Sequence, residues 1–319
     1  MTKFSVAMIA AFAAACGGGG KKPDTTSTGT GGGEQMAATE GATDASKTMP
    51  TPKPEDKPAP PPPRKVMKSV MADKLDWKPL VPEAGDKGPM VATMFGDMMS
   101  AANGFFIKLP AGDKGLLHTH TNDYHGVGVT ATSAAQDGGK THAVAASSYW
   151  FQPGGTAHLN ACPGKTPCIG FAHFTAGKFD FAPAKPAKGA KPDPKAVEKT
   201  AKAAKWVKFD ETNAKSPAFS PLWGDMKTGP FGMYIKTPPG NAAFWHLHSS
   251  DYHAVVLAGT VDHRESGTEP IWHTPGSYWW QPAGNKHVDL CKADGPECLI
   301  YLYMEGPFDV VQPADDGKL

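Results

Sequence analysis

Residues 118–125 read His-Thr-His-Thr-Asn-Asp-Tyr-His, and residues 246–253 read His-Leu-His-Ser-Ser-Asp-Tyr-His. A second element follows each copy, Pro-Gly-Gly-Thr-Ala-His at 153–158 and Pro-Ala-Gly-Asn-Lys-His at 282–287. Two motifs that recur in the same order, at an almost constant separation, indicate a duplicated structural unit. The histidine-rich repeat therefore predicts two copies of one domain.

The agreement between the halves extends beyond the histidines, since Trp77 corresponds to Trp206. Segments with strand composition, such as 105–109, 254–257 and 299–303, alternate with Gly, Pro and Asp turns. No stretch shows a convincing helical period of apolar residues. This pattern predicts an all-β fold in which each half is a barrel or jelly roll.

Composition divides the chain into further parts. The chain has 36 glycines and 31 prolines, which is well above the usual share. The segment after the N-terminal apolar stretch has almost no large apolar residue, so we expect a disordered tether. The expected parts are a signal segment 1–16, a Gly/Thr/Pro-rich tether 17–70, a first domain 71–181, an Ala/Lys/Pro linker 182–205 and a second domain 206–319.

The N-terminus predicts export. An apolar stretch from Phe4 to Ala15 is too short to span a bilayer comfortably and ends in small residues, as a cleaved signal does. The run 13–16, Ala-Ala-Ala-Cys, resembles a bacterial lipobox, although alanine stands where leucine is expected. This resemblance implies lipid attachment to Cys16 and a position in the outer membrane, facing the periplasm or the surface. The alternative is an ordinary secreted protein.

The other four cysteines form two close pairs, Cys162 with Cys168 and Cys291 with Cys298. Each pair brackets a turn-like segment, which favours one disulfide across each turn in an oxidising compartment. Reduced thiols or a thiolate metal site are the alternatives, but no further cysteine lies near either pair to complete a four-cysteine site.

The spacing of the histidines favours metal binding. Alternate side chains of a strand share one face, so His118 and His120 point the same way, as do His246 and His248. Two imidazoles on one face can bind a single metal ion. The element at 153–158, repeated at 282–287, adds a further histidine after a tight turn.

These residues resemble the motifs of the cupin superfamily. Its first motif is His-x-His followed, after three or four residues, by a glutamate, and its second is Pro-x-Gly-x-x-His. The second motif is complete in both halves, whereas the glutamate position, counted with four intervening residues, holds a histidine. The resemblance covers roughly residues 77–309 and implies two tandem cupin barrels. It implies these ligands: His118, His120, His125 and His158 in the first barrel, and His246, His248, His253 and His287 in the second.

An all-histidine site differs chemically from a site with three histidines and a glutamate. Imidazoles bring no charge to offset a divalent ion, which favours iron, nickel, copper or zinc over manganese. One such ion is expected in each domain. His125 and His253 are either ligands, bases or outer groups that support the ligands.

Other conspicuous residues have plainer interpretations. His142, His173, His263 and His273 lack counterparts at the aligned positions and are expected to be structural. Asp123 and Asp251 either orient a ligand imidazole or shape a turn. The tryptophans Trp150, Trp245, Trp279 and Trp280 are expected to pack in the barrels or between them rather than bind substrate.

Three functions fit these observations. The first is a metal-dependent oxidoreductase, an iron dioxygenase acting on a small organic molecule. The second is a non-catalytic module that binds or senses metal or a small ligand, and the third is a metal-dependent isomerase or lyase. The formal charge of +1 gives no reason to expect nucleic acid as a partner. The membrane is expected as a partner only through the lipid anchor, and no residue reveals the substrate.

Overall fold

The computed structural model describes residues 64–130, 132–136, 141–185, 191 and 193–313. The expected signal segment, Cys16 and nearly all of the expected tether lie outside this part of the chain. Within the described residues, no helix is long and apolar enough to cross a membrane.

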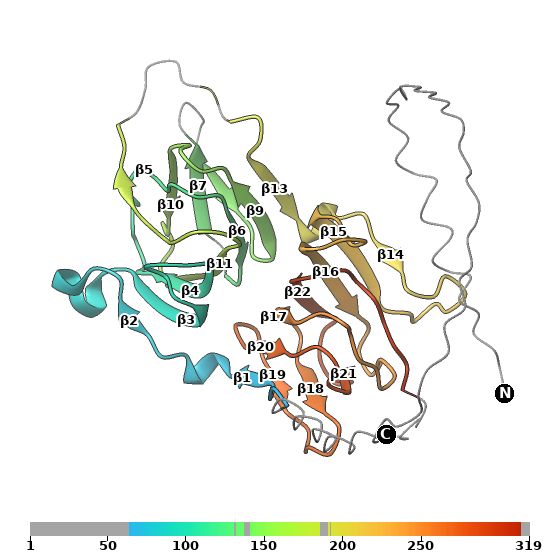
Figure 1. The fold of residues 1–319 in the computed structure, drawn as a ribbon. Coiled ribbons are helices and arrows are strands. Elements are labelled where there is room, and N and C mark those ends of the chain that lie inside the picture. Colours follow the sequence, from blue (N-terminus) through green and yellow to red (C-terminus); the bar gives the residue numbers. More distant parts are fainter. Residues whose placement is uncertain (1–63, 131, 137–140, 186–190, 192, 314–319) are drawn as a thin grey trace, which may run out of the picture. The chain divides into compact units, whose positions relative to one another are not determined.

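The first half is built from two antiparallel sheets (Figure 1). The larger sheet contains, in spatial order, β13 (Val197–Thr200), β9 (Ser148–Gln152), β6 (Tyr124–Gly128), β11 (Cys168–Phe174), β4 (Asn103–Leu109), β3 (Met90–Gly96) and β2 (Lys78–Pro79). The smaller sheet contains β12 (Ala182–Pro183), β5 (His118–Thr119), β10 (His158–Ala161), β7 (Thr132–Gln136) and β8 (His142–Val144). The histidine motifs thus lie on two strands of the smaller sheet, β5 and β10.

The second half repeats this arrangement. Its larger sheet contains, in spatial order, β1 (Lys68–Val70), β20 (Tyr278–Gln281), β17 (Tyr252–Ala258), β22 (Cys298–Met304), β16 (Phe231–Thr237), β15 (Ala218–Gly224) and β14 (Val207–Lys208). Its smaller sheet contains β19 (Trp272–His273), β18 (Val261–Glu265) and β21 (His287–Cys291). Short 3-10 helices complete the described elements: η2 (Ala72–Lys74), η3 (Pro82–Lys87) and η4 (Ala201–Ala203). The all-β architecture agrees with the sequence prediction.

The two halves exchange edge strands. β1, which precedes the first half, pairs with β20 of the second, while β13, which precedes the second half, pairs with β9 of the first. Each large sheet is therefore extended by a strand from the segment that leads into the other domain. The structure thus places strands inside two segments expected from composition to be a tether and a linker.

A shared aromatic core joins the two large sheets. Buried side chains from both halves form a single cluster that includes Phe106, Val127 and Tyr149 with Val255 and Tyr278. Strand β6 is consequently buried along its whole length, because one face meets the barrel interior and the other meets the second half. A strand buried on both faces has two distinct sets of inward side chains, which matters for the site.

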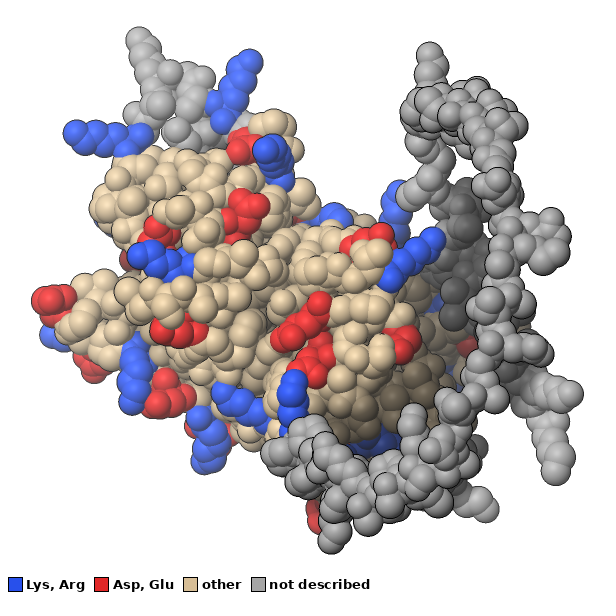
Figure 2. All heavy atoms as spheres, viewed as in Figure 1, with Lys and Arg blue, Asp and Glu red and all other residues tan. Residues whose placement is uncertain are grey.

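Both expected disulfides are present, Cys162–Cys168 and Cys291–Cys298. Each joins the end of a histidine-bearing strand, β10 or β21, to the start of the next strand in the large sheet. On the face shown in Figure 2, basic and acidic side chains of the described residues are interspersed.

Candidate metal centres

Each barrel brings three histidines together. In the first, His118 of β5 lies directly opposite His158 of β10, and His120 follows at the end of β5. Their ring centroids lie 4.2 to 5.1 Å apart, and one nitrogen of each lies within 4.8 Å of the others. All three side chains are buried. This arrangement has the number and type of ligands of a transition-metal site.

The second barrel reproduces this group. A β-bridge pairs His246 with His287, and His248 completes the set. The ring centroids of His246 and His287 lie 4.3 Å apart, within 0.1 Å of the equivalent separation in the first barrel. The duplication has therefore preserved the arrangement of the ligands as well as their identity.

A backbone carbonyl fixes the orientation of every one of these six imidazoles. In the first barrel His118 Nδ1 lies 2.6 Å from the oxygen of Leu116, and His158 Nδ1 lies 3.2 Å from that of Thr156. His120 Nδ1 bonds the carbonyl of Asp180. The equivalent carbonyls in the second barrel belong to Phe244, Asp309 and Asn285.

Because a carbonyl only accepts hydrogen bonds, each Nδ1 must carry the proton. The lone pair is then on Nε2, the nitrogen that faces the centre of the group, so all six rings have the tautomer that metal binding requires.

Burial favours the neutral imidazole at His118, His158, His248 and His287. It lowers the pKa of His118 to about 4 and that of His158 to about 3, because removal from water disfavours the imidazolium. In the second barrel burial lowers the pKa of His248 to about 4 and that of His287 well below its usual range. At neutral pH these rings are free to donate their lone pairs to a cation.

A tyrosine meets each group at the nitrogen that faces the metal position. The Tyr124 hydroxyl lies 3.0 Å from His158 Nε2, and the Tyr252 hydroxyl lies 3.2 Å from His287 Nε2. Since Nδ1 of each histidine carries the proton, the hydroxyl donates and Nε2 accepts. Both tyrosines are buried beside the three-histidine groups.

His125 and His253 lie outside both groups, contrary to the ligand sets implied by the resemblance. Each follows an inward tyrosine by one residue, so its side chain points to the opposite face of the strand, between the two halves. His125 stacks on Trp223 at 3.9 Å, and Tyr149 Oη lies 2.8 Å from its Nδ1. The structure thus assigns these two histidines to the shared core.

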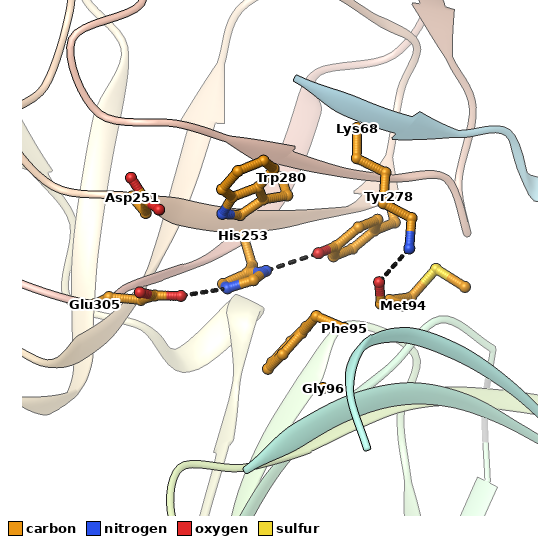
Figure 3. Close-up of a pocket in the computed structure, with 9 residues that line it drawn as sticks. All are labelled: Lys68, Met94, Phe95, Gly96, Asp251, His253, Tyr278, Trp280 and Glu305. Carbon is orange, nitrogen blue, oxygen red and sulfur yellow. Dashed lines mark hydrogen bonds and ion pairs between the residues drawn. The ribbon is translucent and has the colours of Figure 1, made fainter. Parts of the chain in front are cut away.

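His253 lines a cavity of about 330 Å³ between the halves (Figure 3). Its Nε2 lies 2.9 Å from Glu305 Oε1 and its Nδ1 lies 2.7 Å from Tyr278 Oη, while its ring stacks on Phe95 at 4.0 Å. The carboxylate accepts from Nε2, so the tyrosine donates to Nδ1. Every polar atom of this imidazole has a protein partner, which identifies a structural histidine.

The two turn aspartates hold the second motif rather than a ligand imidazole. Asp123 accepts a hydrogen bond from the amide of Gly154 at 2.7 Å, and Asp251 accepts one from the amide of Ala283 at 2.8 Å. Among the other histidines, His173 is buried in the shared core and its Nε2 lies 2.7 Å from Tyr301 Oη. The two aspartates thus hold the second motif in place, and His173 is part of the shared core.

A charged pair lies beside the second group. His263 Nδ1 lies 2.8 Å from Asp289 Oδ1, and its Nε2 lies 3.0 Å from Gln281 Oε1. The Gln281 amide nitrogen donates to Glu265, which fixes the amide orientation. Both ring nitrogens of His263 therefore face acceptors, and a ring that carries both protons forms an ion pair with Asp289. Burial opposes ionisation of Asp289, yet the charge and hydrogen bond of His263 lower the pKa of this carboxyl below its ordinary range.

Comparison with known proteins places the chain in a family. Residues 68–215 and 200–318 each match the model of a domain of unknown function, DUF4437. The chain belongs to this family and carries its domain twice. No curated protein matches the sequence.

Solved structures support the fold. A candidate dioxygenase from Nostoc punctiforme superposes with a TM-score of 0.59 at 12% identity, covering 78% of this chain and 87% of the other. Oxalate decarboxylase from Bacillus subtilis superposes with a TM-score of 0.51 at 11% identity, covering 76% of this chain and 78% of the other. At such identities the likeness shows the fold alone. The chain is a pair of tandem cupin barrels, each with a three-histidine group suited to a metal ion.

Proposed function

We propose that this protein is a metal-dependent oxygenase that holds one iron ion in each barrel and acts on a small organic molecule. The observation that carries the proposal is the orientation of the six imidazoles. Each Nδ1 is bonded to a backbone carbonyl, and the three Nε2 atoms of each barrel are directed at a common point. Three neutral nitrogen ligands leave coordination positions open for substrate and O₂.

The residues have distinct roles in this proposal. His118, His120 and His158 would hold the ion in the first barrel, and His246, His248 and His287 would hold it in the second. Iron bound there would supply redox chemistry with O₂ that side chains cannot provide. The backbone carbonyls hold the rings in the orientation that points Nε2 at the ion, and a tyrosine hydroxyl lies at the edge of each group.

Aromatic side chains make the first centre suitable for an apolar substrate. Phe181 stacks on His118 with ring centroids 4.3 Å apart, and Phe179 lies 5.2 Å from His120. Apolar walls exclude water and favour a small organic ligand. The similarity to a candidate dioxygenase and to a decarboxylase is consistent with chemistry on small molecules, and it supports no particular substrate.

Metal analysis of the full chain, purified from its native compartment without chelator or nickel affinity, tests this proposal. We expect close to two iron atoms per chain and O₂ consumption when candidate substrates are added. Two zinc atoms would contradict the oxygenase and favour the isomerase, lyase or binding roles, whereas a chain without metal would contradict metal binding itself.

Matched double variants assign the ligands. We expect His118→Ala with His120→Ala to remove one metal ion per chain, and His246→Ala with His248→Ala to remove the other. Removing two of three ligands leaves one imidazole, which binds a divalent ion weakly. Unchanged metal content in either double variant would contradict the assignment of that centre.

We also propose that the chain is exported and anchored to the outer membrane by lipid on Cys16. The two disulfides fit an oxidising compartment. Fractionation of cells that express Cys16→Ser tests the anchor: the variant should move from the membrane to the soluble fraction. A wild-type chain already found in the soluble fraction would contradict the anchor and leave ordinary secretion.

A further inference from the structure

We propose that Tyr124 and Tyr252 supply the fourth protein ligand of the two metal centres, through their phenol oxygens. This inference rests on the proposed metal binding and goes beyond it, because it changes the donor set from three nitrogens to three nitrogens and one oxygen.

The first argument is position. In each barrel the hydroxyl contacts Nε2 of the third histidine, at 3.0 Å in the first and 3.2 Å in the second. That nitrogen faces the metal position because Nδ1 of the same ring is bonded to the carbonyl of Thr156 or Asn285. The phenol oxygen therefore lies beside the position to which the three imidazoles converge.

The second argument is spacing. Two ligands about 2.1 Å from one ion, at tetrahedral or right angles, lie about 3.0 to 3.4 Å from each other. The separations between the phenol oxygens and Nε2 fall in this range. Hydroxyl and imidazole can thus exchange their hydrogen bond for bonds to a shared ion with little movement of either side chain.

The third argument is register. Three residues separate His120 from Tyr124, and four separate it from His125. Only the first of these positions points into the barrel, since His125 lies in the shared core. The inward position that follows the His-x-His pair is thus tyrosine in both halves, and the phenol is the oxygen donor available there.

Binding of the phenol oxygen to the ion releases the phenol proton. When the oxygen binds the ion, its O–H bond breaks, the proton leaves to solvent, and an oxygen–metal bond forms with no change in oxidation state. In the first barrel Asn160 Nδ2 lies 3.4 Å from Tyr124 Oη and can donate to the coordinated oxygen. A phenolate offsets part of the cation charge, which neutral imidazoles do not.

Visible spectroscopy of the iron-loaded full chain tests the inference. The chain is loaded with ferrous iron without oxygen and then oxidised, because a phenolate bound to ferric iron gives a charge-transfer band in the visible and characteristic tyrosinate modes in resonance Raman spectra. We expect the wild type to show the band and the Raman modes of both centres. Tyr124→Phe and Tyr252→Phe should each keep the signals of the other centre only, and the double variant should show neither signal. The iron content should stay at two per chain, because the three histidines remain.

Tyr149→Phe and Tyr278→Phe are matched controls. Each removes a buried hydroxyl that contacts a histidine, but those histidines, His125 and His253, lie outside the metal groups. We expect the control variants to keep the full band. Wild-type protein that binds two iron ions without a band, or a band that persists in the double variant, would overturn the inference. Failure to bind iron at all would instead overturn the proposed function.

Discussion

The two barrels carry the same three-histidine group and the same tyrosine, but they differ in the residues beside them. In the second barrel His263 pairs with Asp289 next to the metal group. Strand register places Ala134 and Asn160 at the equivalent positions of the first barrel. A charged pair in one barrel thus corresponds to two uncharged residues in the other.

A second difference lies where the halves meet. His125 is covered by Trp223, whereas the equivalent His253 is covered by the smaller ring of Phe95 and borders the cavity with Glu305 (Figure 3). After duplication, the ligand geometry has stayed constant while the surroundings have diverged. The two centres therefore have the same donors in different electrostatic environments, and variants that exchange the surroundings can separate their roles.

The largest effect on stability is expected from the two histidines in the shared core. We expect His125→Ala to lower the free energy of unfolding by about 3 kcal/mol, since it leaves a void beneath Trp223, whose indole donates to Tyr301 and is held in place. We expect His253→Ala to cost less, because this ring already borders a cavity. Urea unfolding measures both values.

Metal content distinguishes this structural role from a ligand role. Both variants should keep two metal ions per chain, because neither ring belongs to a metal group. Loss of one ion in either variant would restore the histidine to its ligand set and contradict the register described above.

Sequence reasoning predicted the duplication, the all-β class, the disulfides and the three histidines that lie together in each barrel. These features depend on repeated spacing and on side-chain chemistry that is readable residue by residue. The strand-like segment 299–303, for example, lies within β22.

The fourth position was missed for a physical reason. The cupin motif allows three or four residues before the position of its acidic ligand, and a shift of one residue turns a strand side chain to the opposite face. Counting four intervening residues leads to His125, whereas counting three leads to Tyr124. The turn between His120 and β6 hides the register, and only the three-dimensional pairing of β6 with β9 and β11 resolves it.

The composition of residues 182–205 also failed to predict a strand, β13. Ala, Lys and Pro predict a linker, yet β13 within this segment pairs with β9. Its stability comes from an edge that the other half of the chain provides, which local sequence does not encode.

The charged pair of the second barrel should account for the next largest effect. We expect Asp289→Asn, which introduces the amide of the first barrel, to destabilise the protein by about 2 to 3 kcal/mol, because it removes the carboxylate that pairs with the buried ring of His263. This expected loss of stability is at the low end of the range for breaking a buried ion pair, because a quarter of the Asp289 side chain is exposed. Thermal unfolding measures the effect. Addition of His263→Ala to Asp289→Asn should recover part of the loss, and strictly additive losses would show that the two groups do not interact.

The disulfides are expected to have similar, smaller effects in the two barrels. They close short loops, with six residues of separation in the first and seven in the second. Loop-closure entropy predicts about 2 kcal/mol for each. Replacing both cysteines of one pair by alanine and comparing urea midpoints measures this contribution. A much larger loss in one barrel would indicate that its disulfide also holds the ligand strand in place.

The smallest effect concerns pH and a position at which the barrels differ, His273 in the second and Val144 in the first. His273 Nε2 lies 2.7 Å from Ser69 Oγ of β1, and burial lowers its pKa to about 4. Between about 6.5, the value in an unfolded chain, and about 4, only the unfolded state binds the proton, so stability falls as the pH falls.

The slope for one such histidine is at most about 1.4 kcal/mol per pH unit. His273→Val, which introduces the residue of the first barrel, should remove the contribution of His273 to the pH dependence of the free energy of unfolding. The contribution of the histidines in the two metal groups stays the same in both proteins. Urea unfolding of metal-free wild type and variant at pH 7 and pH 5.5 therefore isolates the contribution of this one ring. Equal slopes in the two proteins would mean that protonated His273 is accommodated beside β1.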